Sequence, residues 1–270
     1  ARDEAATVAS VVEGVRATLG CAVLVVDDAS SDTTAAAARG AGAAVLSLPL
    51  CLGAWGATQA GIRYALRNGF TNVITLDADG QHVPGSLPLL VAAQAESRAN
   101  VVIGTCVGRL SRAKRIAWHY LRFLTGLKLT DFTSGLRLYD EAAIKVLAGQ
   151  EASLLDYQDV GVLMLLSRSG LRIAETPVPM LPRRAGRSRV FASWPVVARY
   201  MMHTTVLCLA QLDAVRRHSP GRADPSCGPG RSPRRSSASR WPARSCSWSG
   251  AIICMVLTRS GGSRSPRRRS

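Results

Sequence analysis

The sequence has few aromatic residues, no long hydrophobic run and no metal-binding pattern of cysteines. Phe, Trp and Tyr together make up 5% of the 270 residues. No stretch reaches the roughly 18 uncharged apolar residues that a membrane-spanning helix needs. The seven cysteines form neither a CxxC pair nor a zinc-ligand spacing. We therefore expect free thiols in a reducing compartment, with no secretory signal, and not a disulfide or zinc scaffold.

Acidic residues are also scarce, 18 against 34 Lys and Arg, which gives a net charge of +16. The positive charge is unevenly distributed, because residues 1–217 have a net charge of +6 and residues 218–270 a net charge of +10. The part of the chain that can form a core is only mildly basic, so we do not expect nucleic acid as a partner. Residues 218–270 are dominated by Arg, Ser, Pro and Gly, and we predict that they are disordered.

Apolar runs alternate with amphipathic stretches along the first part of the chain. Strands are expected at 21–26, 43–48, 72–76 and 101–104, and helices at 3–19, 31–39, 53–67 and 87–96. This alternation with short connections predicts an α/β fold, with a mostly parallel central sheet and helices on both faces. Further on we expect a basic amphipathic helix at 109–127, strands within 131–138 and 171–178, helices at 141–147 and up to 166, and an apolar helix at 194–215.

Two carboxylates, Asp77 and Asp79, directly follow the apolar strand expected at 72–76. Ligands of open α/β sheets gather at the carboxyl ends of strands. Two acidic side chains there repel each other unless a cation lies between them, and Mg²⁺ or Mn²⁺ suits one or two protein carboxylates with substrate phosphates in the remaining positions. An ordinary acidic turn explains the same stretch equally well, because Asp and Gly are common turn residues.

Four stretches, taken in order, resemble motifs of the family 2 glycosyltransferases. They are Asp27-Asp28-Ala29-Ser30-Ser31-Asp32-Thr33, Asp77-Ala78-Asp79-Gly80-Gln81-His82, Asp131-Phe132-Thr133-Ser134-Gly135-Leu136-Arg137 and Gly186-Arg187-Ser188. The last two are similar to segments of the polyprenyl-phosphate (dolichol-phosphate) hexosyltransferase branch. The resemblance covers about residues 2–216 and implies a GT-A (Rossmann-like) domain at 1–188. An amphipathic helix at 189–217, suited to a membrane interface, and the disordered tail would follow.

The resemblance implies a metal-dependent, inverting transfer of a hexose from a UDP- or GDP-sugar to polyprenyl phosphate or a related membrane-linked acceptor. Such an enzyme would be cytoplasmic and would attach peripherally to the inner face of the membrane. Asp77 and Asp79 would hold Mg²⁺ or Mn²⁺. The donor would be bound by Asp27, Asp28, Asp77 and Gln81. The candidate catalytic carboxylates are Asp131 and, in competition with it, Asp159. The candidate phosphate or acceptor ligands are Arg137, Arg184, Arg187 and Ser188.

The sequence departs from the family pattern in two places. We expect the first strand, central in this fold, to be missing, which would expose two strand edges, and Asp3 stands where Asn is usual. Cys51 and Trp55 interrupt a segment that is glycine-rich in the family. The alternative function is therefore a truncated, catalytically impaired nucleotide-sugar-binding remnant. A sugar nucleotidyltransferase is less favoured, because no glycine-rich basic loop follows an early strand.

Overall fold

The computed structural model describes residues 1–77, 79–106, 112–155, 159–181, 202, 204–206 and 254–258. Most of the helix expected at 189–217 and most of the tail lie outside these residues; within that expected helix, residues 202 and 204–206 are described and are helical. The remaining expected elements are present, and several have the predicted bounds within one or two residues.

The first half of the chain alternates between strands and helices, as predicted. Its elements are α1 (Val8–Leu19), β1 (Ala22–Asp27), α2 (Thr34–Gly40), β2 (Ala44–Ser47), α3 (Gly53–Arg67), β3 (Asn72–Thr75), the short 3-10 helix η1 (Pro84–Ser86), α4 (Leu87–Ser97) and β4 (Val101–Thr105). The second half contains α5 (Arg112–Thr125), β5 (Arg137–Tyr139), α6 (Glu141–Ala148), the 3-10 helix η3 (Glu151–Leu154), α7 (Val160–Arg168), β6 (Ile173–Pro177) and β7 (Cys254–Thr258).

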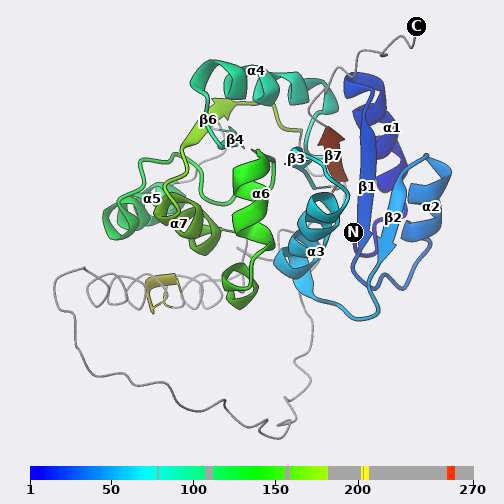
Figure 1. The fold of residues 1–270 in the computed structure, drawn as a ribbon, viewed down its shortest axis with the longest axis horizontal. Helices are drawn as coiled ribbons and strands as arrows, with labels where there is room; N and C mark the ends of the chain where they lie inside the picture. The colour runs from blue at the N-terminus through cyan, green and yellow to red at the C-terminus, as the bar shows by residue number, and fades with distance from the viewer. Residues whose placement is uncertain are drawn as a thin grey trace, which may run out of the picture.

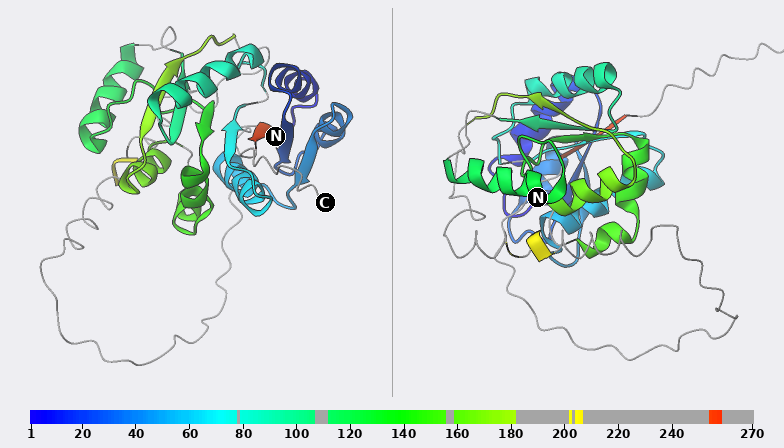
Figure 2. Two further views of the ribbon diagram at one scale, coloured as in Figure 1. Left: turned by 45° about the horizontal axis from the view of Figure 1, so that its top comes forward. Right: turned by 90° about the vertical axis from the view of Figure 1, so that its left-hand side faces the viewer.

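The seven strands form one sheet in the order β2-β1-β7-β3-β5-β4-β6 (Figure 1). β1, β2, β3, β4 and β6 run in the same direction, whereas β5 and β7 run against them. The expected α/β architecture is thus confirmed. Helices cover both faces of the sheet (Figure 2), with α1, α2 and α4 on one face and α3, α5, α6 and α7 on the other.

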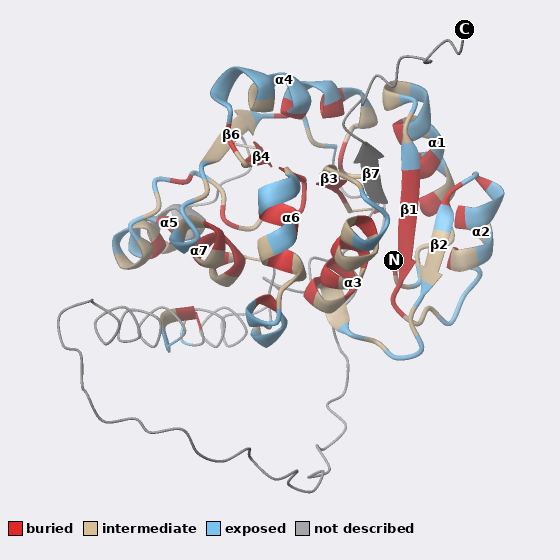
Figure 3. Cartoon of the chain, in the orientation of Figure 1, coloured by how far each residue is buried: buried red, intermediate tan, exposed pale blue. Residues whose placement is uncertain are grey.

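Two apolar cores lie on the two faces of the sheet, and β1 shows how the sequence forms both. Successive side chains of a strand point to opposite faces. Leu24 and Val26 accordingly belong to the core beneath α3 and α6, and Val23 and Val25 belong to the core beneath α1 and α4. Continuous apolar runs are what a strand covered on both sides requires, and β1 is buried along nearly its whole length (Figure 3).

The position between β1 and β3 is occupied by β7, which comes from the tail that we predicted to be disordered. β7 pairs antiparallel with both neighbours, and Val256 lies opposite Val23 of β1 and Ile74 of β3. The prediction of disorder is therefore wrong for Cys254–Thr258, and the expected open edges of β1 and β3 are filled. Unpaired backbone N–H and C=O groups at the centre of a sheet are energetically costly. A short run rich in apolar residues can form hydrogen bonds with both β1 and β3.

The expected basic amphipathic helix is present as α5. Trp118 and Leu121 are buried, and the Trp118 ring meets the Phe132 ring edge to face, with centroids 6.0 Å apart. Phe123, by contrast, is 89% exposed. The helix therefore both packs against the domain and presents an apolar side chain at the surface. None of the helices in the described residues combines the length and the apolar character needed to cross a bilayer.

Candidate functional site

The candidate site lies at the edge of the sheet where β1, β3 and β4 end. Because β5 runs antiparallel, the loop that leads into it reaches the same edge. Three of the four sequence motifs therefore lie along this edge: the loop after β1, the loop after β3 and the loop before β5. The last two are adjacent, since β3 and β5 are direct neighbours, whereas β7 lies between β1 and β3.

Asp77 and Asp79 follow β3 directly. The Asp79 carboxylate is buried, and its Oδ1 accepts a hydrogen bond from the Gln81 backbone N–H at 3.1 Å. The Asp77 side chain is 28% exposed, and its Oδ2 lies 3.4 Å from Nε2 of His82. The Asp79 carboxylate is thus fixed within its own turn, and the Asp77 carboxylate lies between His82 and the solvent.

His82 is buried behind Asp77, and its Nδ1 has no hydrogen-bond partner among the described residues. Its backbone forms an isolated antiparallel bridge with Met180, and the Leu181 N–H donates to the Gln81 carbonyl at 2.8 Å. The segment that continues from β6 therefore holds the loop of the two carboxylates from one side. The structure thus places His82 in direct contact with Asp77.

The loop before β5 carries Asp131. Asp131 Oδ1 accepts hydrogen bonds from the N–H and the hydroxyl of Thr133, at 2.9 and 3.0 Å. The loop is also tied to both neighbouring strands, because the Ser134 hydroxyl donates to the Gly104 carbonyl and the Thr75 hydroxyl to the Gly135 carbonyl.

Gly135 packs directly against the Asp77 carboxyl group. A methyl group at this glycine would lie 2.7 Å from Asp77 Oδ2 and 2.9 Å from Oδ1, closer than ordinary contact. The third motif thus contacts the second one, although 58 positions separate the two residues in the chain. Sequence inspection identified both motifs but did not indicate this contact.

Arg137 does not occupy the position that we expected for a phosphate ligand. Its side chain is fully buried in β5, where Nε donates to the Ser134 carbonyl at 2.9 Å and Nη2 to the Phe132 carbonyl at 2.8 Å. A guanidinium whose donors bind the carbonyls of its own loop is turned away from the surface. This is a correction: Arg137 holds the shape of the Asp131 loop in this structure.

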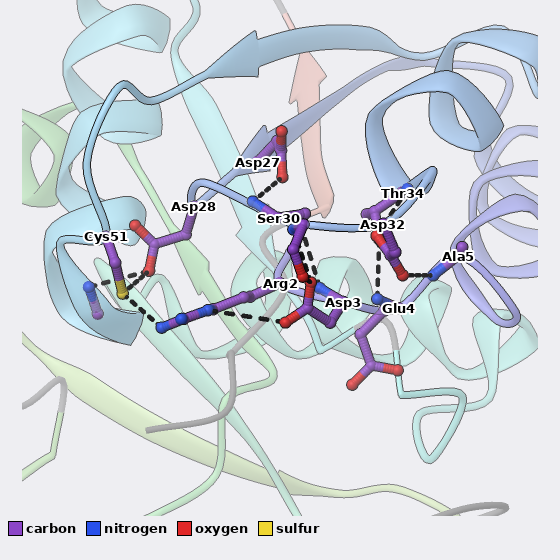
Figure 4. A network of polar contacts seen from close by, with 12 residues as sticks. Arg2, Asp3, Glu4, Ala5, Asp27, Asp28, Ser30, Asp32, Thr34 and Cys51 are labelled. Carbon is purple, nitrogen blue, oxygen red and sulfur yellow. Dashed lines mark hydrogen bonds and ion pairs between the residues drawn. The ribbon is translucent and has the colours of Figure 1, made fainter. Parts of the chain in front are cut away.

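The loop after β1 carries two buried aspartates with different partners (Figure 4). Asp28 accepts hydrogen bonds from the N–H groups of Leu52 and Gly53, at 2.6 and 2.9 Å, and so binds the start of α3. These two donors lie 24 and 25 positions further along the chain. The carboxylate of Asp27 accepts a 3.2 Å bond from the Ser30 N–H.

Asp32 organises the neighbouring turn. It accepts bonds from the N–H and hydroxyl of Thr34 and from the N–H of Ala5, as Figure 4 shows. Burial alone would raise the pKa of the Asp32 carboxyl, but these hydrogen bonds together lower it below the ordinary value of 3.8. Asp3 completes the turn, because its Oδ1 accepts from both the N–H and the hydroxyl of Ser31.

The two residues that break the family's glycine-rich segment fit the structure. The Cys51 thiol donates to Asp28 Oδ2 at 3.3 Å, and Cys51 Sγ also accepts a bond from Arg2 at 2.9 Å. Trp55 is buried, and its indole N–H donates to the Ala152 carbonyl at 2.7 Å. Both side chains therefore form hydrogen bonds that glycine, which has no side chain, could not form at these positions.

The other predicted site residues follow later in the chain. Asp159 is at the N-terminus of α7, a helix that packs against α6. Arg184, Arg187 and Ser188 lie outside the described residues. One residue that sequence inspection missed is Glu175 of β6, whose carboxylate binds the backbone next to Asp131. The feature of the sequence that could have indicated Glu175 is its position as an acidic residue within an otherwise mostly apolar strand.

Residues 1–149 match the model of glycosyl transferase family 2, which is more than half of the 270 residues. The chain belongs to glycosyltransferase family 2. The expectation drawn from the motifs is thereby confirmed for the family and for the class of activity, glycosyl transfer. The family 2 match ends just after β5 and α6, so it contains the loops of Asp27, Asp77 and Asp131.

Two curated relatives belong to the expected polyprenyl-phosphate branch. Undecaprenyl-phosphate mannosyltransferase of Micrococcus luteus is 35% identical over 185 residues, which are 62% of this chain and 75% of that protein. Polyprenol monophosphomannose synthase of Mycolicibacterium smegmatis is 28% identical over 191 residues, 63% of this chain and 71% of that protein.

A solved structure confirms the GT-A fold. Glucosyl-3-phosphoglycerate synthase of Mycobacterium tuberculosis, crystallised with Mn²⁺, UDP-glucose and phosphoglyceric acid, superposes with a TM-score of 0.55 at 19% identity. The superposition covers 78% of this chain and 76% of that one. At this identity the likeness concerns the fold alone.

Proposed function

We propose that this glycosyltransferase moves a hexose from a UDP- or GDP-sugar to polyprenyl phosphate, with inversion at the transferred carbon. One observation carries the proposal: the Asp77 carboxyl group lies against Gly135, in the loop that holds Asp131. The loop of the carboxylates suited to a metal and the loop of the carboxylate suited to an acceptor are therefore in contact. The names of the relatives from M. luteus and M. smegmatis, which refer to undecaprenyl phosphate and polyprenol, support this acceptor.

Asp79 and Asp77 would hold Mg²⁺ or Mn²⁺. The described residues contain no group of three His, Cys, Asp or Glu side chains arranged to bind a metal. A pair of carboxylates still fits, because Mg²⁺ commonly takes one or two of them and completes its shell with water and substrate phosphates. When bound, the metal neutralises the charge that develops on the diphosphate leaving group. The Mn²⁺ and UDP-glucose bound to the M. tuberculosis protein support a divalent ion.

The chain's own residues would bind and orient the two substrates. Asp27 and Gln81 remain our candidates for the donor, and Asp28 would act mainly by fixing the start of α3 beside it. A phosphate acceptor is already an anion, so it needs little help from a general base. We therefore assign Asp131 the role of orienting the acceptor, and Asp159 is the competing candidate for the same role.

The acceptor also requires access to a membrane surface. We propose peripheral attachment at the cytoplasmic face, supported by α5, which buries Trp118 and exposes Phe123 beside basic residues. Arg184, Arg187 and Ser188 would bind the acceptor phosphate, because the planar fork of arginine matches phosphate oxygens.

The test is a transfer assay with UDP- and GDP-hexoses, Mg²⁺ or Mn²⁺, and polyprenyl phosphate in detergent or vesicles. We expect transfer that stops on chelation and falls by at least about 100-fold in Asp79→Ala, the size typical of losing a key electrostatic group. Glu96→Gln, at an exposed position of α4, removes one acidic charge as the matched control and should leave transfer unchanged.

Each outcome separates the candidates. Full turnover in Asp79→Ala would refute the metal role of the aspartate pair. Metal-dependent donor binding without turnover would favour the catalytically impaired remnant. Release of pyrophosphate from a sugar phosphate and a nucleoside triphosphate would favour the nucleotidyltransferase.

A further inference from the structure

We infer that Glu175 is a positioning residue for transfer, which holds the backbone of Asp131 in place from the neighbouring strand. The inference rests on the role proposed for Asp131. Glu175 lies in β6, at the edge of the sheet, opposite Ile103 of β4. Neither the sequence motifs nor the family match include it, since the matched residues end at 149.

The contacts of Glu175 are concentrated on one short stretch of backbone. Oε1 accepts from the N–H groups of Thr130 and Asp131, at 2.8 and 3.0 Å. Oε2 accepts from the Thr130 hydroxyl at 3.0 Å and approaches the Thr130 N–H at 2.9 Å. Two successive backbone N–H groups that point at one anion form a small anion-binding nest. Here the anion is a side chain of the protein itself.

This arrangement fixes the peptide units on both sides of Thr130 and the start of Asp131. The rest of the loop is held by other elements, because Arg122 of α5 donates to the Leu129 carbonyl at 2.6 Å and the Asp131 carboxylate binds Thr133. Glu175 is therefore the contact that sets where the Asp131 backbone sits relative to β6. Hydrogen bonds to a charged acceptor are about twice as strong as neutral ones, which suits this task.

The same strand also reaches the metal loop. Directly after β6, Val178 N–H donates to the Thr105 carbonyl, and Leu181 N–H donates to the Gln81 carbonyl. One continuous segment thus contacts the Asp131 loop through Glu175 and the Asp77–Asp79 loop through residues 180 and 181. The relative position of the two loops depends on this segment. A small displacement of a positioned group is enough to slow a reaction strongly.

The structure predicts what each substitution does. Glu175→Gln keeps the size of the side chain but replaces one accepting oxygen with an NH₂ group, so it loses at least one of the contacts to Thr130 or Asp131. We expect kcat to fall on the order of 10-fold to 100-fold. The KM for the donor should change little, because the donor candidates lie on other loops. Thr130→Val removes only the hydroxyl contact and should have a smaller effect.

The experiment is a double-mutant cycle on the full-length chain, with Glu175→Gln, Asp131→Asn and the two combined. If Glu175 acts through Asp131, the double variant has the same kcat as Asp131→Asn alone. Glu141→Gln is the control, since it removes the same charge from an exposed pair with Lys145 on α6. Melting curves and hydrogen exchange accompany the kinetics, and we expect faster exchange in residues 126–135 of Glu175→Gln but not in β1.

The outcomes distinguish this inference from the proposed function. If Glu175→Gln turns over as the parent does, or if its effect adds fully to that of Asp131→Asn, the positioning role is refuted. A uniform loss of stability without local exchange near residue 130 would refute it as well, by showing a general structural role. If Asp131→Asn itself is fully active, the proposed role of Asp131 fails and this inference fails with it. Loss of transfer in Asp79→Ala would still support the proposed function.

Discussion

The contact between Gly135 and Asp77 makes a sharp prediction for Gly135→Ala. The backbone of Gly135 does not have a positive φ, so alanine fits its conformation. The new methyl group, however, would lie 2.7 Å from Asp77 Oδ2, 2.9 Å from Oδ1 and 3.0 Å from Cγ. All three atoms belong to one carboxyl group, so the strain falls on a single side chain, that of our candidate metal ligand.

The size of the effect follows from these distances. Ordinary contact begins at 3.4 Å, so the Asp77 carboxylate has to retreat by about 0.7 Å, the difference between 3.4 and 2.7 Å. A misplacement of about 1 Å can cost on the order of 100-fold in rate, so we expect a loss of roughly 10-fold or more. Because Asp77 would bind the metal, the Mn²⁺ concentration for half-maximal activity should rise. The melting temperature should change little, since the carboxylate can rotate toward solvent.

Two glycines provide controls for Gly135→Ala. Gly40→Ala in α2 meets no atom within 4 Å and should leave activity unchanged. Gly104→Ala would place its methyl group 2.8 Å from Leu136 Cδ2 and 3.1 Å from Val178 Cγ2, so it overpacks the core without touching the carboxylate. We expect it to lose about 1–3 kcal/mol of stability. The reasoning is refuted if Gly135→Ala has the kcat and the Mn²⁺ dependence of the parent in a transfer assay.

Two further predictions concern the sheet and the first loop. Val256→Pro removes a backbone N–H from the strand between Val23 and Ile74, so we expect a lower melting temperature and faster hydrogen exchange in residues 22–25 and 72–74. Ser263→Pro, at a position beyond the end of β7, is the control, and unchanged exchange in Val256→Pro would contradict the placement of β7. Asp32 has a lowered pKa, so its contribution to stability is present above the ordinary value of 3.8 and is lost as the pH falls through the folded value. Asp32→Asn should therefore flatten the acid limb of a stability–pH curve, and a limb as steep as the parent's would exclude this role.

Local sequence signals predicted most of the elements, because their causes are local. The helix expected at 53–67 has these bounds in the structure, since glycine precedes its amphipathic pattern and Asn68 follows it. The first helix differs for a non-local reason. We expected it to begin at residue 3, but it begins at Val8, because Asp3 adopts a positive φ and binds Ser31.

The same holds for the site: its motifs could be predicted from local sequence, whereas its long-range contacts could not. Motif spacing predicted Asp77, Asp79 and Asp131 as site residues, and the strand order explains why the loops that carry them are adjacent. Motif spacing could not reveal that Asp28 binds the start of α3, that the Arg137 side chain points inward, or that Glu175 holds Thr130 and Asp131. Each of these depends on a backbone group that lies 5 to 45 positions away, and backbone groups leave no trace in the sequence.

The position of β7 links the tail of the chain to the geometry of the site. β1, which ends at Asp27, pairs with β2, and β3, which leads to Asp77, belongs to the other half of the sheet. β7 hydrogen-bonds to both and separates them by two strand spacings, about 9.6 Å at the usual 4.8 Å each. Direct pairing of β1 with β3 would halve that separation, and so would change the spacing between Asp27, our candidate for the donor, and Asp77, our candidate for the metal. A substitution within Cys254–Thr258 should therefore weaken donor binding, although no residue of β7 belongs to a sequence motif of the site.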